Sequence, residues 1–352
     1  MGRFCAVLAG TLALLALTVA CGGGSDAPPT PSVEPAATST PPRAAPTPQP
    51  TARPATAEVA AVPTPRCPDP YPAGAPFQPT PGAPIRLQPT GAAPAIAPYQ
   101  PLTFVRDAAL ERVMRDTLGE EAEHFGVYVK SLADGKGGTI SRNRSFYAAS
   151  LYKTWVLLEA LHQRDAGLLD LDEMLIVSDY YESLGLNSGE LQACERVSVR
   201  EAVGRMMSVS DNVAANLALD RVGAWNVNLA IEALGLGASG FVGGSVPTTA
   251  ADIALLLEAV AQGQALNETS SGEMLLLLGS EVVDGRLPAL LPAEARVAHK
   301  TGSWDTATHD AGLVFSPEAT YVIVVLTDYG YADGGAERIA ELSRAVYDYY
   351  NR

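Results

Sequence analysis

Residues 150–158 read SLYKTWVLL, which places a serine hydroxyl and a lysine amine three residues apart and then continues with apolar side chains. On a helix, Ser150 and Lys153 would be separated by about one turn and would share a face. Serine is a weak nucleophile until a neighbour accepts its proton, and a lysine in a dry, electropositive pocket can do so because its pKa falls. Ser150 would also stand at the helix N-terminus, where free backbone N–H groups favour negative charge. The stretch therefore predicts a buried helix that carries a nucleophile and its base.

The scarcity of lysine strengthens this interpretation of Lys153. The chain has four lysines, and Lys153 is the one preceded by a serine at the third position upstream. In an average protein most Ser-x-x-Lys matches are accidents of the surface, so the pattern needs support from the rest of the sequence.

Two further polar motifs lie downstream. The Ser-Asp-Asn triplet at residues 210–212 stands between apolar stretches, where unpaired polar side chains cost free energy. Taken alone, the triplet is more typical of a helix cap or turn than of a catalytic site. The Lys-Thr-Gly-Ser sequence at residues 300–303 supplies a charge and two hydroxyls, and its glycine lets a ligand approach the backbone. Alone, this sequence could also form a simple turn at the end of a strand.

In this order, the three motifs resemble those of the active-site serine penicillin-recognising family, which includes class A β-lactamases and related penicillin-binding proteins. The resemblance covers roughly residues 102–352, and it is reinforced by Asn216, by the Thr-Thr-Ala-Ala-Asp sequence at 248–252 and by Arg-Leu-Pro at 286–288. It implies an α/β fold with an antiparallel sheet, flanked by N- and C-terminal helices, and an inserted all-helical domain. The sheet part would span about 102–149 and 286–352, and the helical part about 150–285.

The resemblance also implies catalytic roles. Ser150 would be the nucleophile that forms an acyl-enzyme, and Lys153 would be its base or part of the proton relay. Ser210 would pass a proton to the departing nitrogen. Lys300 would anchor the relay and attract the substrate carboxylate.

The remaining motif residues would bind the substrate. Asn212 would hold the amide side chain of the substrate. The hydroxyls of Thr301 and Ser303, on either side of Gly302, would bind the substrate carboxylate. The backbone N–H groups of Ser150 and Ser303 would form the oxyanion hole.

The sequence departs from the family where class A β-lactamases carry the glutamate that activates the deacylating water. The matching stretch, residues 234–249, reads LGLGASGFVGGSVPTT and contains neither Asp nor Glu. Glu232 lies upstream in a helical pattern and is expected at the surface, whereas Glu182 and Glu190 are substitutes without a spacing argument. Because water attack is slow without a nearby base, we expect Ser150 to acylate readily and β-lactam turnover to be slow or to use another base.

A second departure concerns the substrate carboxylate. No Arg or Lys occurs between Thr301 and Glu337, so the arginine that the family often supplies from the neighbouring strand is absent. Arg338, on the last predicted helix, is the candidate replacement.

Hydrophobic periodicity predicts the order of helices and strands in the same region. Residues 169–279 should be mostly helical, with loops at 185–189 and 235–247. The two strand regions should meet in one sheet with the terminal helices on one face, and a cleft should separate this sheet from the helical part. The other expected elements are helices at 104–118, 150–166 and 335–350, and strands at 124–132, from 139, and at 295–303, 310–315 and 321–328.

Charge and composition exclude several classes of partner. The formal net charge is −15, and the few charges before residue 102 nearly cancel, so the acidic character belongs to the globular part. Such a domain repels phosphate backbones, and it has too few basic residues to adhere to anionic lipid. The charge therefore predicts no nucleic-acid partner. The four histidines and four cysteines show no metal-ligand spacing, so we expect no metal and no cofactor.

The N-terminal third predicts export and a tether. Residues 1–20 have the charge and apolar run of a signal peptide, and Cys21 ends a sequence that resembles a bacterial lipobox, although a plain secretory signal is the alternative. Of the 27 prolines, 23 lie between residues 22 and 101, so residues 21–101 are expected to form an extended linker with no core. We therefore expect an exported protein, lipid-anchored on the outer face of the bacterial cell membrane. The linker is either a stalk or a passive spacer.

The two remaining cysteines can form a disulfide. Cys5 leaves with the signal peptide and Cys21 is the lipidation site, which leaves Cys67 and Cys194 in an oxidising compartment. A Cys67–Cys194 bridge would staple the linker to the domain, and two free thiols are the alternative.

Three functions remain open from the sequence. The first is a serine hydrolase that forms an acyl-enzyme with β-lactams. The second is a peptidoglycan D,D-peptidase or penicillin-binding-like enzyme that acts on D-Ala-D-Ala peptides. The third is a non-catalytic envelope binding protein, which the intact motifs disfavour.

Overall fold

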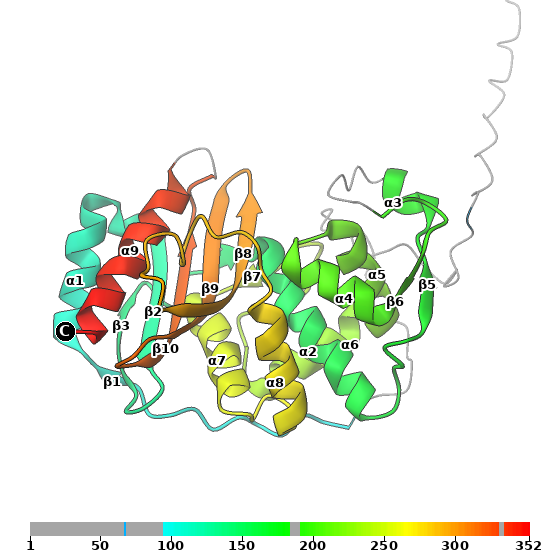
Figure 1. Cartoon of the computed structure of the whole chain (residues 1–352), viewed down its shortest axis with the longest axis horizontal. Helices are drawn as coiled ribbons and strands as arrows, with labels where there is room; N and C mark the ends of the chain where they lie inside the picture. The colour runs from blue at the N-terminus through cyan, green and yellow to red at the C-terminus, as the bar shows by residue number, and fades with distance from the viewer. Residues whose placement is uncertain (1–66, 68–93, 184–190, 331–333) are drawn as a thin grey trace, which may run out of the picture. The chain divides into compact units, whose positions relative to one another are not determined.

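The computed structural model describes residue 67 and residues 94–183, 191–330 and 334–352 (Figure 1). The predicted signal peptide, Cys21, nearly all of the predicted linker and Glu190 lie outside the described residues. Within the described residues, no helix combines the length and the apolar content needed to cross a bilayer.

Six strands form the central sheet, in the order β1–β3–β2–β10–β9–β8. Neighbouring strands are antiparallel except for β1 and β3, which are parallel. The β2–β10 pairing, with Phe125 opposite Thr327, joins the two predicted strand regions in one sheet, as expected. The bounds are β1 Val105–Arg106, β2 Phe125–Ser131, β3 Lys136–Ile140, β8 Arg296–Trp304, β9 Ala307–Phe315 and β10 Thr320–Thr327.

The two terminal helices, α1 (Ala108–Leu118) and α9 (Gly335–Tyr350), lie side by side on one face of the sheet (Figure 1). Their apolar faces supply Met114 and Ile339 to a core shared with the sheet strands. The sequence predicts that α1 begins at Phe104, whereas the helix begins four residues later. The reason is a cap, because the side chain of Asp107 accepts hydrogen bonds from the backbone N–H groups of the first turn.

A group of helices lies beyond the other face of the sheet (Figure 1), and α2 packs among them against α4, α5, α6 and α8. Ten of the fourteen residues of α2 are buried, which fits the apolar run from Trp155 to Leu158. The bounds are α2 Tyr152–Asp165, α3 Asp179–Ser183, α4 Val199–Ser208, α5 Asn212–Val222, α6 Ala224–Leu234, α7 Ala250–Ala261 and α8 Glu268–Leu278.

Several short elements in this part do not follow from the periodicity of the sequence. Strands of two or three residues are too short to show an alternating pattern. They are β4 Phe146–Tyr147, which pairs with β7 Pro247–Thr248, and β5 Met174–Ile176, which pairs with β6 Arg196–Ser198. The 3₁₀ turns are η1 Gly119–His124 and η2 Ala149–Leu151.

The packed region begins upstream of residue 102, inside the stretch predicted as linker. Ile96 and Tyr99 are buried in the core. The Leu102 N–H donates to Oε1 of Glu258 at 2.8 Å, and Lys130 of β2 forms a buried ion pair of 2.7 Å with the same glutamate of α7. These contacts fix residues 96–102 against the domain.

The predicted disulfide between Cys67 and Cys194 is present, with the two Cα atoms 5.2 Å apart. It links residues 127 positions apart, which in a chain-entropy treatment restricts the unfolded chain by roughly 5 kcal/mol. Cys194 lies just before β6. Its N–H donates to the carbonyl of Val177, which directly follows β5. The bridge therefore ties a residue of the predicted linker to the helical part of the fold.

Candidate active site

Ser150 lies in a turn that is held from three sides. The preceding residue, Ala149, has a φ of 47°, a left-handed conformation that a non-glycine residue adopts at a cost. The N–H of Ala148 donates to the carbonyl of Val246 at 2.7 Å, which fastens the turn to the loop before β7. Local strain of this kind is common at functional sites and persists only where the surroundings impose it.

His309 of β9 also holds this turn, through a hydrogen bond to the segment just before Ser150. Its Nδ1 accepts the Thr327 N–H at 3.2 Å, so the proton lies on Nε2, which donates to the Tyr147 carbonyl at 2.8 Å. Burial lowers the pKa of His309 to about 4, so the ring is neutral at physiological pH. This histidine bridges two strands and the segment that ends at Ser150.

Lys153 is the second residue of α2, and its ammonium group points at the Ser-Asp-Asn motif. Its Nζ donates to Oγ of Ser210 at 3.0 Å, to the carbonyl of Ser210 at 2.6 Å and to Oδ1 of Asn212 at 2.7 Å. Burial lowers the pKa of Lys153 well below its usual value, and the positive charge of Lys300 adds to this effect. Lys153 is therefore poised to lose its proton far more easily than a surface lysine.

The Ser-Asp-Asn triplet forms a helix cap and also places two polar side chains at Lys153. Asp211 caps α5, because its side chain accepts the Ala214 N–H at 3.0 Å. Ser210 has a φ of 57°, and this conformation leaves the side chains of Ser210 and Asn212 directed at Lys153. The cap thus holds the two polar groups in place.

The Lys-Thr-Gly-Ser motif occupies the end of β8. A Cβ on Gly302 would lie 3.1 Å from the carbonyl oxygen of Ala148 and 3.4 Å from Cβ of Ala149. The glycine therefore lets the turn that carries Ser150 pack closely on the strand, because a larger residue would press on Ala148 and Ala149.

Arg286 is a site residue that the sequence did not assign to the carboxylate of the substrate. Its guanidinium is buried and donates to the carbonyls of Gly302 and His309 and to Oγ of Ser303. It thus brings a fixed positive charge to the end of β8 that carries Ser303. Arg338 does not take this place, because it bonds to Glu121, Glu341 and the last carbonyls of α1.

Glu281 is the second site residue that the sequence did not predict. It follows α8, its side chain is fully buried, and it forms an ion pair with Nζ of Lys300. The same Oε2 accepts the Thr301 hydroxyl at 3.2 Å. Lys300 therefore meets a carboxylate inside the protein, and the charge of this lysine is locally balanced.

Residues of all three motifs line one cleft of about 770 Å³. Lys153 and Lys300 lie buried behind its surface. Trp304 and Asp305 stand at its rim, where the Trp304 ring lies 5.5 Å from that of Tyr147. Asp305 is the one acidic residue among those that line the cleft, and the polar side chains lining the cleft nearest the motifs are Ser150, Ser210, Asn212, Arg286, Thr301 and Ser303.

The loop that matches the missing glutamate is built around an aromatic side chain. Phe241 is buried, and its ring packs against those of Tyr152 and Trp155 at 5.7 Å and 6.0 Å. Asn228 of α6 fixes the loop, accepting the Phe241 N–H at 2.8 Å and donating to its carbonyl at 3.0 Å. Nearby Glu232 is exposed, as expected.

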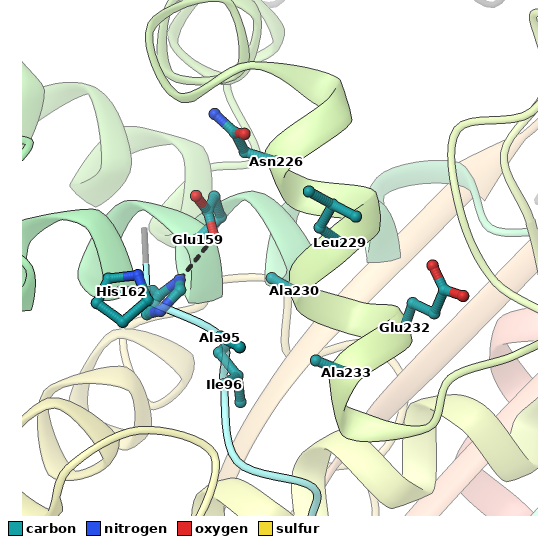
Figure 2. A pocket seen from close by; sticks show the side chains of 10 residues that line it. Ala95, Ile96, Glu159, His162, Asn226, Leu229, Ala230, Glu232 and Ala233 are labelled. Atoms are coloured by element: carbon teal, nitrogen blue, oxygen red, sulfur yellow. Dashed lines mark hydrogen bonds and ion pairs between the residues drawn. The ribbon is translucent and has the colours of Figure 1, made fainter. Parts of the chain in front are cut away.

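A second cavity, of about 360 Å³, lies between residues 94–96, α2 and α6 (Figure 2). In it, Nδ1 of His162 lies 3.0 Å from Oε2 of Glu159, and Gln163 donates to the other carboxylate oxygen at 2.7 Å. No motif residue lines this cavity, so it is separate from the cleft at Ser150. Over the described parts of the chain, no three acidic, histidine or cysteine side chains gather as metal ligands.

Comparison with known proteins places this geometry in context. Residues 108–350 match the model of the β-lactamase enzyme family. The extended-spectrum β-lactamase PER-1 of Pseudomonas aeruginosa is 26% identical over 267 residues, which cover 68% of this chain and 86% of that protein. Among solved structures, PBP-A is similar with a TM-score of 0.65 and 26% identity, over 72% of this chain and 99% of PBP-A. A mutant of PBP-A, solved as an acyl-enzyme complex with penicillin G, gives the same values.

Proposed function

The chain belongs to the β-lactamase enzyme family and is a serine hydrolase that acts on β-lactams, and from this premise we propose that it acylates quickly at Ser150 and deacylates slowly. The observation that carries this proposal is the contrast between a complete set of acylation residues and a loop at 234–249 that contains no carboxylate.

Acylation needs a neutral amine close to the serine. Because its pKa is lowered, Lys153 can be neutral and accept the proton of Ser150 as Oγ attacks the β-lactam carbonyl carbon. The C–N bond of the lactam then breaks, and the nitrogen takes a proton from Ser210, which recovers one from Lys153 through their hydrogen bond. The proton thus passes from one serine to the substrate nitrogen, and Lys153 ends as it began.

The negative charges of the substrate have two separate positions. The backbone N–H groups of Ser150 and Ser303 would bind the oxyanion, since the turn and the strand pack together at Gly302. The substrate carboxylate would bind at Arg286 and Ser303, because Arg286 supplies a planar, permanently charged donor there. Asn212 would receive the amide side chain of the substrate.

Deacylation requires a base that activates a water beside the ester. In the loop that would supply it, Phe241 packs against Tyr152 and Trp155 of α2. Removal of a general base typically slows a step by about 10² to 10⁴. A long-lived acyl-enzyme follows from this arrangement.

A D,D-peptidase acting on D-Ala-D-Ala peptides is the second candidate function. It is supported by the missing deacylation base and by the similarity to PBP-A over 99% of that chain. The same Ser150 would carry the acyl group, with water or an amine as the acceptor.

We also propose that the protein is exported and lipid-anchored at Cys21. The apolar leader and the small residues before this cysteine support the proposal. Cell fractionation of the wild type and of Cys21→Ala tests it. A lipid anchor predicts that the wild type sediments with membranes and the variant is released, whereas equal release of both would refute it.

Pre-steady-state hydrolysis of a chromogenic cephalosporin tests the main proposal. We expect a burst of about one product per enzyme, followed by a much slower steady rate. A steady rate without a burst and with rapid turnover would contradict slow deacylation. Ser150→Ala is the control, and it should give neither phase.

A further inference from the structure

Two lysines in the described part of the chain form ion pairs with glutamates inside the protein. Lys130 pairs with Glu258, with side chains 1% and 2% exposed, and Lys300 pairs with Glu281, with both side chains 0% exposed. The two pairs are alike in chemistry and burial. They differ in place, because the first links β2 to α7 and the second lies beside the cleft residue Thr301.

The two glutamates are also bonded differently. Both oxygens of Glu258 accept hydrogen bonds from Lys130, and Oε1 accepts the Leu102 N–H as well. Glu281 instead uses Oε2 for all its contacts, and within the described residues its buried Oε1 has no hydrogen-bond partner. Buried polar atoms are usually satisfied, so the arrangement at Glu281 is costly for a purely structural pair.

We propose that Glu281 is a positioning residue for acylation, which keeps Lys300 charged and orients the Thr301 hydroxyl so that Lys153 works beside a permanent positive charge. This inference deepens the proposed function and rests on acylation at Ser150.

The electrostatic reason is the burial of Lys300. Burial lowers the pKa of Lys300, and the Glu281 carboxylate opposes that effect most strongly. The charged Lys300 in turn lowers the pKa of Lys153, more than Glu281 raises it. The other ionisable groups that act on these lysines are Asp310, Arg286 and Asp211, and His299 lies beside Lys300 on β8.

Loss of the Glu281 charge would therefore act through Lys300. In Glu281→Gln, Lys300 would lose its proton at a lower pH and leave Lys153 without its positively charged neighbour. Acylation should then decline at a lower pH on the alkaline side than in the wild type. The Thr301 hydroxyl, which now donates to Glu281, would also lose its fixed direction.

Lysine NMR reads the first effect without any substrate. The chain contains only four lysines, so selective ¹³Cε labelling gives a spectrum of four resonances: Lys130, Lys136, Lys153 and Lys300. In the full-length protein we expect Glu281→Gln to move the Lys300 titration down by about 1 to 3 pH units. Glu258→Gln is the matched control, because it removes the other buried glutamate and should leave the Lys300 titration in place.

The rate of penicillin adduct formation against pH reads the second effect. The alkaline decline should shift with the Lys300 titration in Glu281→Gln, stay in place in Glu258→Gln, and lie between wild type and Glu281→Gln in Glu281→Asp. A folded Glu281→Gln protein with unchanged Lys300 titration would overturn the inference. If Glu281→Gln does not fold, the same titration is measured in Glu281→Ala, which also removes the charge, and an unshifted Lys300 there would do so. If the wild type forms no adduct, the proposed function fails, but the Lys300 titration still decides the role of Glu281.

Discussion

The two sides of the Ser150 turn are built from different chemistry. On one side, buried cations bond to polar side chains: Lys153 of α2 with Ser210 and Asn212, and Arg286 with Ser303 of β8. On the side of the loop at 234–249, the ring of Phe241 packs on α2. The polar side can form the acyl-enzyme, and the apolar side has no group to clear it. The comparison teaches that the two half-reactions depend on separate walls, so one can be retained while the other is lost.

Removal of Lys153 should have the largest effect, and it acts on the polar wall alone. We expect Lys153→Ala to slow adduct formation by about 10² to 10⁴. Because burial lowers the pKa of Lys153, wild-type acylation should rise with pH through a range well below 10.5, and this rise should vanish in the variant. Stopped-flow acylation across the pH range measures both effects.

Lys136→Ala is the matched control, since the Lys136 side chain is 59% exposed and lies outside the cleft. Its acylation profile should coincide with that of the wild type. An unchanged rate in Lys153→Ala would move the base elsewhere and break the comparison.

Truncation of Phe241 tests whether the loop wall is a packing element. Phe241→Ala should lower the free energy of unfolding by about 3 to 5 kcal/mol, because it leaves a cavity against Tyr152 and Trp155. Urea denaturation measures the loss. The neighbouring Val242, 59% exposed, provides the control, since Val242→Ala should change stability by less than about 0.5 kcal/mol. Equal effects of the two substitutions would show that Phe241 does not support the loop.

The disulfide should affect stability without favouring either wall. Cys67→Ser combined with Cys194→Ser should cost about 2 to 5 kcal/mol in the free energy of unfolding. The ratio of acylation to deacylation rates should stay the same under conditions where the variant is folded. A changed ratio would mean that the bridge shapes the cleft.

Asp305 should give the smallest effect. It is the one acid lining the cleft, but it is exposed and stands at the rim on the strand side. We expect Asp305→Asn to change deacylation by less than about threefold, whereas loss of a true base would cost about 10² or more. Decay of a preformed penicillin adduct, followed by mass spectrometry, distinguishes the two results.

Much of the fold could be predicted because its elements are long or punctuated. The strand pattern at residues 295–303 and the closing helix at 335–350 lie where periodicity placed them. The start of α1 was placed too early, since Phe104 continues the apolar spacing but Asp107 forms the cap. The paired strands β5 and β6 escaped prediction because three residues carry no period.

The site was partly predictable for a similar reason. Short motifs in the sequence identify Ser150, Lys153, Ser210, Asn212 and residues 300–303. The structure places these motifs together, at or directly behind one cleft. Glu281 is a lone acid after a helix, and nothing in its local sequence shows that it becomes buried beside Lys300. One physical signal was present, because a lysine predicted inside a strand needs a counter-charge when buried.

The time course of the intact mass of the protein after mixing with penicillin tests the central claim most directly. The account predicts an adduct of one penicillin per chain that forms quickly, persists for many minutes and is absent in Ser150→Ala. An adduct that forms and clears within seconds, with release of opened penicillin, would contradict it, because a base for deacylation would then be at work in the wall that holds Phe241 or elsewhere in the cleft.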